Sequence, residues 1–387
     1  MIESLRLEAT RLWQGTYPRF VCAREPGPPA GDYLPVFTFH TLEPGDFEDK
    51  LRYLRDNGYR TITLEQAVAH VRGDEPAAPR SVLLTIDDGR LSTWSVGRPL
   101  LRRFGMHAAA FVIAGFLEDG PPRPTLDDGD PTGGTGAALS EDRDRMTVLR
   151  WSEVEALHAS DAVDVQSHTW MHKRVSVSRR LEGFVTPDDG RASYDVPCPA
   201  RASSAAEARD PAWEPGAPIF EHAPILAVPT ALEPPVSLLR ACTDRARQEG
   251  GEAFFRRSGW RRELRRVVEA CDDDFRRVDL EPHQRRELVA SREALGRRLG
   301  GPGARHLCLP SGQASDRSVR LARESGYVST LWGHLPAGRT NRPGADPHRI
   351  GRLKHDYVHR LPGSGRRGLL RVLAEKAGRR IRGDTGY

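Results

Sequence analysis

The chain has 387 residues, of which 38% are hydrophobic, 30 are Pro and 37 are Gly. This length allows one large barrel or two to three domains, and the high Pro and Gly content predicts that much of the chain is loop or insertion. The formal net charge of +5 arises in residues 360–387, where eight Lys and Arg face two acidic residues. This placement disfavours a nucleic-acid binder, which presents basic residues along a whole face.

The cysteines and the N-terminal residues bear on the compartment. The five cysteines lie far apart and form no Cys-x-x-Cys pair, which is typical of free thiols in a reducing compartment. Residues 1–20 lack the apolar run of a signal peptide, and no run approaches the ~20 apolar residues of a membrane span. We therefore expect a cytoplasmic protein without a membrane partner.

The chain begins with a segment that we expect to be peripheral. Residues 1–32 contain a short amphipathic stretch and a Pro- and Gly-rich linker. An apolar run over 33–40 then predicts the first strand, and helical spacing predicts a helix over 46–59. His40 ends this strand, where it either lines a site or makes an ordinary hydrogen bond.

The most informative stretch is the apolar run 81–86, which leads directly into an Asp-Asp-Gly string at 87–89. Two other such strings, at 127–129 and 188–190, stand among prolines and glycines and are typical of turns. Two ionised carboxylates at the mouth of a buried strand repel each other unless a cation or a proton compensates them. A functional pair is thus favoured over a simple turn with Asp at its start.

Strands and helices alternate after this pair. A helix is predicted over 99–104, a strand over 107–113 and a helix over 147–158, which indicates parallel strands joined by helical crossovers. Residues 118–145 interrupt the alternation with prolines, glycines and several Asp, and we expect a loop there that covers the site as a lid.

Two histidines four residues apart, His168 and His172, follow a short apolar run at 162–165. In a helical turn the two imidazoles share a face with Cβ atoms about 5–6 Å apart, which suits two nitrogens on one metal ion. The alternative is a pair of half-buried histidines with ordinary hydrogen bonds. A carboxylate from another strand end completes a three-ligand site with an open position, the pattern of a catalytic zinc.

The stretch 176–290 separates the histidines from the last strands and is predicted to be an insertion. Its first half is rich in Pro, Ala, Ser and Arg and should be irregular, whereas 236–272 has helical spacing. A substrate-recognition subdomain is the first expectation, and a dimerisation element of a homo-oligomer is the second. A buried strand over 306–312 follows, and 361–387 form a basic amphipathic helix expected to pack on the domain rather than to contact a membrane or nucleic acid.

These motifs resemble those of the polysaccharide deacetylase family, the NodB-homology fold of metal-dependent carbohydrate esterases. Residues 85–89 resemble its first motif, 168–172 its second, and 309–312 with 324–327 its third. The resemblance covers 33–116, 146–174 and 305–355. It implies an α/β protein with a distorted (β/α) barrel, built from 33–175 and 291–360 around the insertion 176–290.

The resemblance also implies roles for the site residues. Asp87 is then the general base, and Asp88, His168 and His172 hold a divalent ion, for which zinc is the first expectation. The direction of the side chains agrees, since neighbouring residues near a strand end point to different sides. One carboxylate can therefore bind the ion while the other meets the attacking water.

The amine leaving group needs a proton. His355, expected where the final strand ends, is the candidate acid, and His359 and His334 compete with it.

The turn Pro310, Ser311 and Gly312 is expected to bind substrate together with His40, and a backbone N–H near Ser311 completes an oxyanion site. The family commonly has an aromatic residue where Ser311 stands and an arginine beside the base. No arginine can be assigned to that place from this sequence.

The predicted activity is hydrolysis of a linear amide, with Asp87 as the base. The expected substrate is a small N-acylated amino sugar or glycoside, because the extra loop and the insertion should close the mouth of the barrel into a pocket. The alternatives are a chitin-like polysaccharide or oligosaccharide deacetylase, and a degenerate carbohydrate-binding protein that retains the metal. The intact Asp87 favours an enzyme, since a binding protein has no need of an uncoordinated base.

Overall fold

The computed structural model describes residues 8, 10–24, 33–128, 147–187, 193–209, 211–301 and 303–381. Most of the predicted lid, and the Asp-Asp-Gly string at 188–190, lie outside the described residues. Within the described part, no helix has both the length and the apolar character needed to cross a membrane. All five cysteines are free thiols, as predicted.

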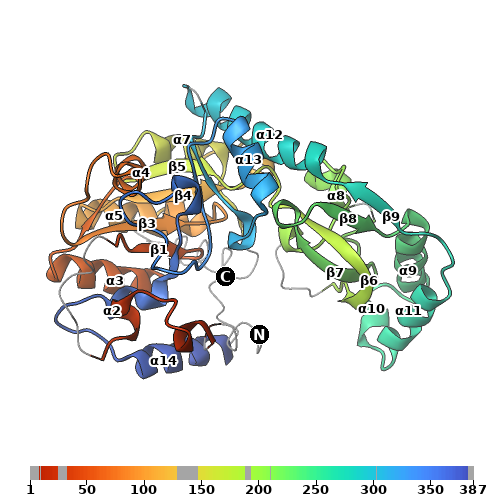
Figure 1. Cartoon of the computed structure of the whole chain (residues 1–387). Coiled ribbons are helices and arrows are strands. Elements are labelled where there is room, and N and C mark those ends of the chain that lie inside the picture. The colour runs from red at the N-terminus through yellow and green to blue at the C-terminus, as the bar shows by residue number, and fades with distance from the viewer. Residues whose placement is uncertain are drawn as a thin grey trace.

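The main domain is built on one parallel sheet in the order β11-β10-β5-β4-β3-β1-β12, with β2 paired to β3. The two end strands leave the sheet open, so it forms a half-barrel (Figure 1), and the predicted α/β fold class is confirmed. Its strands are β1 (Val36–Phe39), β2 (Arg60–Thr61), β3 (Ser81–Ile86), β4 (Ala108–Val112), β5 (Val163–Ser167), β10 (His306–Cys308), β11 (Ser329–Leu331) and β12 (Leu353–Lys354).

Apolar cores lie on both faces of this sheet. Every residue of β3 and β4 is buried, which explains why these strands are continuous apolar runs rather than alternating ones. Leu84 belongs to one core and Leu83 to the other, because successive side chains point to opposite faces. The surrounding helices are α3 (Pro44–Asp56), α4 (Leu64–Arg72), α5 (Arg98–Phe104), α7 (Trp151–His158), α12 (Glu281–Leu299) and α13 (Asp316–Glu324).

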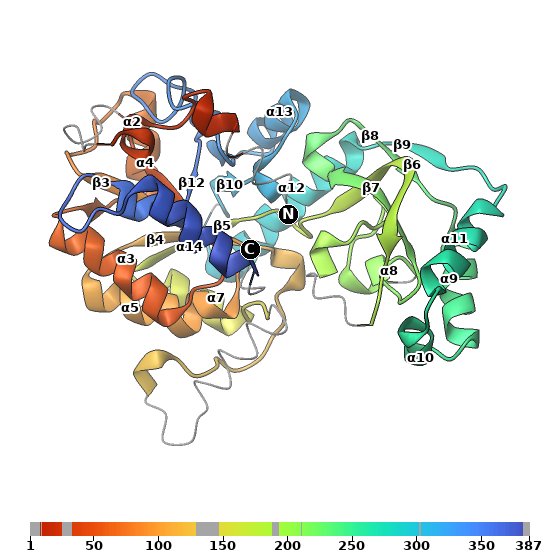
Figure 2. The same cartoon turned by 90° about the horizontal axis from the view of Figure 1, so that it is seen from below.

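The insertion forms a lobe beside the sheet (Figures 1 and 2). The predicted helical stretch 236–272 holds three helices, and the lobe has its own core. The first half, expected to be irregular, instead contains a strand pair, because apolar residues such as Phe184 and Phe220 are buried in that core between the prolines. Its elements are β6 (Arg174–Phe184), α8 (Ala205–Arg209), β7 (Pro218–Pro224), β8 (Thr230–Glu233), α9 (Val236–Gln248), α10 (Glu252–Arg256), α11 (Trp260–Glu269) and β9 (Arg276–Asp279).

The C-terminal boundary of the insertion also differs from the prediction. Helix α12 runs without a break from Glu281 to Leu299 and packs against α7 and α13 of the main domain. The lobe therefore ends near residue 280 rather than 290, because one continuous helix crosses the predicted boundary.

The N-terminal segment packs more closely than predicted. Tyr17 is buried in the main core, as are Phe20 and Val21 of α2 (Arg19–Cys22). Glu8 is buried in an ion pair with Lys376 of α14 (Leu369–Ile381), and Figure 1 shows α2 and α14 on the same side of the domain. The expectation that residues 1–32 are peripheral is corrected for the described ones, because their aromatic and apolar side chains cover the main core.

Candidate active site

The carboxyl end of β3 presents two neighbouring aspartates. Asp87 and Asp88 are only 2% and 5% exposed, and Asp88 has a left-handed backbone conformation with φ of 69°. Such a conformation is uncommon for a non-glycine residue and clusters at functional sites. Gly89 follows with φ of 64°, and a Cβ there would lie 3.1 Å from Val112, so this turn requires glycine.

Asp87 is held by an arginine from the far end of the chain. Arg352 donates from Nη1 to Asp87 Oδ1 at 2.7 Å and from Nε to the Trp332 carbonyl at 2.9 Å. Burial raises the pKa of Asp87, but the charge and hydrogen bond of Arg352, together with His168 and His40, outweigh burial and lower the pKa to about 2. Asp87 is therefore an oriented anion at neutral pH. Arg352 is the arginine beside Asp87 that could not be assigned from the sequence.

Asp88, His168 and His172 converge on one point. Their ligand atoms lie within 4.8 Å of one another, and His168 Nε2 is 3.4 Å from Asp88 Oδ1. His168 Nδ1 lies 2.9 Å from the Cys308 carbonyl oxygen, so Nδ1 carries the ring proton and Nε2 is available to a metal ion.

The electrostatics of His172 also fit a metal ion. Burial lowers the pKa of His172 to about 3, so its imidazole is neutral at pH 7. Its buried Nδ1 has no hydrogen-bond partner, which leaves a polar atom unsatisfied in the pocket wall. Two imidazoles and a carboxylate form a donor set suited to a divalent ion such as zinc.

The two histidines meet through a bend and not through the predicted helical turn. Thr169 and His172 have φ of 68° and 51°, and the His168 and His172 rings lie 4.9 Å apart. The hydroxyl of Thr169 accepts the N–H of His172 at 3.0 Å and stabilises this left-handed path. The spacing of four was informative, but the backbone brings the rings together differently.

A buried carboxylate on α12 holds the bend. Glu287 accepts the Met171 N–H at 2.8 Å and pairs with Lys173 Nζ at 3.1 Å, and its carbonyl accepts the Trp170 N–H at 3.1 Å. Lys173 also donates to the Ala200 and Ala202 carbonyls, so the buried ammonium is well satisfied. The position of the histidine bend therefore depends on Glu287.

Asp87 and Arg352, together with Asp88 and the two histidines, face a cavity of about 400 Å³ at the carboxyl edge of the sheet. Its walls come from the sheet, from the insertion and from the N-terminal segment. Besides the residues already described, the wall includes Glu8, Arg11, Tyr17, Thr38, Tyr194, Asp195, Gln313, Gly333, Leu353 and Lys354.

The residues predicted to bind substrate are mostly in this wall. His40, Ser311 and Gly312 line the cavity, and His40 Nε2 is 3.9 Å from Asp87 Oδ2. Pro310 is buried and is not among the lining residues. The Gly312 N–H donates to the Leu309 carbonyl at 2.8 Å, so it is not free for an oxyanion.

The three histidines considered as the acid are dispersed. His334 lines the cavity, where its ring stacks on Tyr17 with centroids 4.1 Å apart. His355 does not line it: β12 is two residues long, the chain then turns into a short 3-10 helix, and the imidazole stacks on Phe39. His359 pairs with Asp49 at 3.2 Å, also away from the cavity wall.

Comparison with known proteins shows a family to which part of this chain is similar. Residues 74–192 match the model of the polysaccharide deacetylase family. This chain carries a polysaccharide deacetylase domain. Poly-β-1,6-N-acetyl-D-glucosamine N-deacetylase of Escherichia coli K12 is 27% identical over 172 residues, which are 44% of this chain and 24% of the relative. YxkH of Bacillus subtilis, itself a candidate polysaccharide deacetylase, is 32% identical over 88 residues, 21% of this chain and 32% of the relative.

A solved structure supports the fold of this chain. The BpsB deacetylase domain from Bordetella bronchiseptica superposes with a TM-score of 0.50 at 16% identity, covering 85% of this chain and 98% of that domain. The curated relatives are matched over only about a quarter to a third of their own length.

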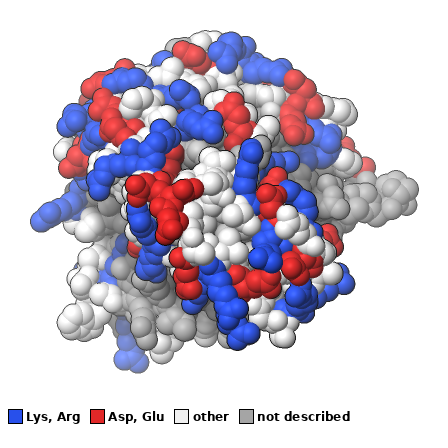
Figure 3. Space-filling view, turned by 90° about the vertical axis from the view of Figure 1, so that its right-hand side faces the viewer, with Lys and Arg blue, Asp and Glu red and all other residues white. Residues whose placement is uncertain are grey.

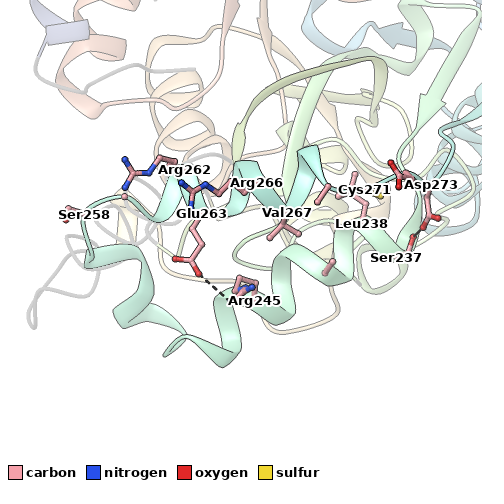
Figure 4. A pocket seen from close by; sticks show the side chains of 14 residues that line it. Ser237, Leu238, Arg245, Ser258, Arg262, Glu263, Arg266, Val267, Cys271 and Asp273 are labelled. Atoms are coloured by element: carbon pink, nitrogen blue, oxygen red, sulfur yellow. Dashed lines mark hydrogen bonds and ion pairs between the residues drawn. The ribbon is translucent and has the colours of Figure 1, made fainter.

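The insertion has a second cavity, a groove of about 820 Å³ between α9 and α11 (Figure 4). Arg262 and Arg266 line it, and Arg245 pairs there with Glu263 at 3.7 Å. Among the described residues, two groups could hold a metal ion, Asp88 with His168 and His172 and Asp87 with His168 and Cys308, and neither lies in this groove. Figure 3 shows basic and acidic side chains interspersed on this side of the molecule, so the lobe presents no field of a single sign.

Sequence reasoning missed Arg352, Glu287 and Tyr194. Arg352 stands just before a predicted strand end, which is the one local signal that it faces the site. Glu287 and Tyr194 lie in regions taken for an appended insertion, where no motif marks them. Each contacts a site residue that lies more than 100 positions away in the sequence.

Proposed function

We propose that this chain is a metal-dependent N-deacetylase of a polysaccharide that contains N-acetylated amino sugars. The observation that carries the proposal is the pairing of a buried anion, Asp87, with the donor set Asp88, His168 and His172 in one pocket. Asp87 is held by Arg352 and is free of the donor set, as a proton acceptor should be. A metal-retaining binding protein would have no use for that arrangement.

Asp88, His168 and His172 would hold the divalent ion, which supplies a Lewis acid for the acyl oxygen and activates water. Asp87 accepts the proton of the attacking water at its carboxylate. Arg352 keeps this carboxylate ionised and oriented. His40 is the imidazole nearest to Asp87, at 3.9 Å, and we assign it in place of His355 to the proton that the leaving amine requires.

A polymeric substrate is favoured over the small sugar expected from sequence. Support comes from the Escherichia coli relative, whose name specifies poly-β-1,6-N-acetyl-D-glucosamine. The argument from added loops is weak, because the described part of the insertion stands mostly beside the sheet as a lobe with its own core (Figure 1), and of its residues only Tyr194 and Asp195 line the cavity.

The test compares substrates of one chemistry and increasing length. Purified protein is incubated with N-acetylglucosamine, with β-1,6-linked and β-1,4-linked oligomers and with the polymers, and released acetate and free amines are measured. We expect β-1,6-linked oligomers to react faster with increasing length and the His168→Ala/His172→Ala variant to be inactive. Faster turnover of the single sugar would restore the small-substrate hypothesis, and binding without acetate release would support the degenerate binding protein.

A further inference from the structure

We propose that Tyr194 of the insertion is a positioning residue for the metal ligands Asp88 and His172, so that the insertion completes the metal site. The inference rests on the proposed metal site and assigns a role to a lobe that otherwise looks like an accessory. Tyr194 lies in the short 3-10 helix Ser193–Asp195, on the connection between β6 and β7.

The hydroxyl of Tyr194 orients the Asp88 carboxylate. It donates to Asp88 Oδ2 at 3.2 Å, across 106 residues of sequence. The other oxygen, Oδ1, is the one that lies 3.4 Å from His168 Nε2. Because one oxygen is engaged by the phenol, the carboxylate is prevented from rotating and its second oxygen stays turned toward the histidines.

A second donor strengthens the same contact. The Arg90 guanidinium lies 3.5 Å from Asp88 Oδ2 and 5.9 Å from the centre of the Tyr194 ring. Arg90 is 1% exposed and Tyr194 is 4% exposed, so both donors act where water does not compete. Asp88 Oδ2 therefore receives its hydrogen bonds from the protein, which leaves Oδ1 for the ion.

The ring of Tyr194 positions the second ligand. It packs edge-on against His172, with centroids 5.2 Å apart and an interplanar angle of 69°. Phe116 supports the ring from another side at 5.9 Å, in a cluster with Ile113. A tyrosine has only two side-chain torsions, so a ring packed in this way is a rigid wall for the imidazole.

The next residue approaches the site as well. Asp195 Oδ1 lies 4.0 Å from His172 Nδ1, the buried nitrogen that has no hydrogen-bond partner. Two consecutive residues of the insertion thus reach two of the three ligands. Removing the insertion should therefore weaken metal binding.

The test is to measure the metal affinity of the Tyr194→Phe variant. This substitution removes the hydroxyl and keeps the ring. We expect Zn²⁺ affinity, measured by competition with a chromogenic chelator, to fall about 10–100-fold, as is usual when an outer partner of a ligand is lost. Activity should fall at limiting Zn²⁺ and recover at excess Zn²⁺. Tyr59→Phe is the matched control, because its hydroxyl donates to the Pro362 carbonyl at 2.9 Å in a buried site away from the cavity.

Unchanged Zn²⁺ affinity in folded Tyr194→Phe would overturn the inference, as would an equal loss in Tyr59→Phe. Should Tyr194→Phe not fold, Phe116→Leu provides a second measurement: it removes a ring that supports Tyr194 and leaves the three proposed ligands in place, so Zn²⁺ affinity should again fall. The wild type separates this idea from the proposed function. Metal binding without deacetylation would contradict the proposed activity but not the role of Tyr194. A wild type that binds no metal would contradict both.

Discussion

At the scale of single residues, Asp87 and Asp88 are neighbours with different surroundings. Asp88 faces two histidines, whereas Asp87 faces a guanidinium. We expect Asp87→Asn to retain metal and to lose activity by roughly 10²–10⁴, because the amide keeps the shape but cannot accept a proton. Metal content by elemental analysis and turnover should be measured on the same sample, and loss of metal in this variant would make Asp87 a ligand instead.

Arg352 sets the ionisation of Asp87, so its removal should change pH dependence. The pKa of Asp87 falls from 3.8 to about 2 on folding, so this pair stabilises the fold above about pH 4 and the contribution is lost as the pH falls toward 2. In Arg352→Met, burial still raises the pKa of Asp87 and only His168 and His40 oppose it, so the pKa should rise. The acid limb of kcat/KM should therefore move to higher pH, and the acid stability of the fold should decrease.

The control for this profile is Arg349→Met, three residues earlier. Arg349 is exposed and pairs with Asp316, so its loss should leave both the pH profile and the acid stability unchanged. An acid limb in Arg352→Met that coincides with that of the wild type would show that the arginine does not govern the base.

At the scale of elements, the histidine bend depends on α12 through Glu287. Glu287→Gln leaves Lys173 buried without its counterion, and breaking such a pair costs on the order of 3–5 kcal/mol. Urea denaturation should show this loss. Glu293→Gln, on the exposed side of the same helix, should change stability by less than about 0.5 kcal/mol. Equal effects of the two substitutions would contradict a special role for Glu287.

Local patterns in the sequence were sufficient for the sheet and for the ligands. The apolar run of β3 and the paired aspartates after it are readable because a buried parallel strand needs continuous apolar residues and its charged end stands out. The histidine pair was found from its spacing, although a helix was expected and a left-handed bend formed. Tyr194 and Glu287 could not be predicted, since their contacts are made through tertiary packing and leave no periodic trace.

At the scale of the whole molecule, the two ends of the described chain are joined beside the pocket. Lys376 of α14 pairs with Glu8 and lies 3.6 Å from Asp356, and the Tyr357 hydroxyl donates to Glu8 at 2.6 Å. Glu8 lines the cavity together with Tyr17. Helix α14 thus helps to hold one wall of the cavity.

We therefore expect Lys376→Met to expose the N-terminal segment, because it leaves the Glu8 carboxylate buried without its ammonium, whereas Asp356 keeps its pair with Arg379. Limited proteolysis should cut within residues 10–24 sooner than in the wild type, and KM should rise while metal content is retained. Arg371→Met is the control, since Arg371 makes only an exposed pair with Glu375 on the same helix. Proteolysis at the same rate in both variants would show that the Lys376–Glu8 pair does not hold the N-terminal segment in place.

The contact between α14 and the N-terminal segment also affects the order in which the protein folds during synthesis. During translation the residues of the proposed metal site leave the ribosome well before α14 emerges. A nascent chain can therefore bring these residues together early, while the wall that holds Glu8 and Tyr17 waits for α14. The complete cavity wall should form only after α14 has emerged, and ribosome-stalled chains that stop before α14 should bind metal while the cavity stays open on one side.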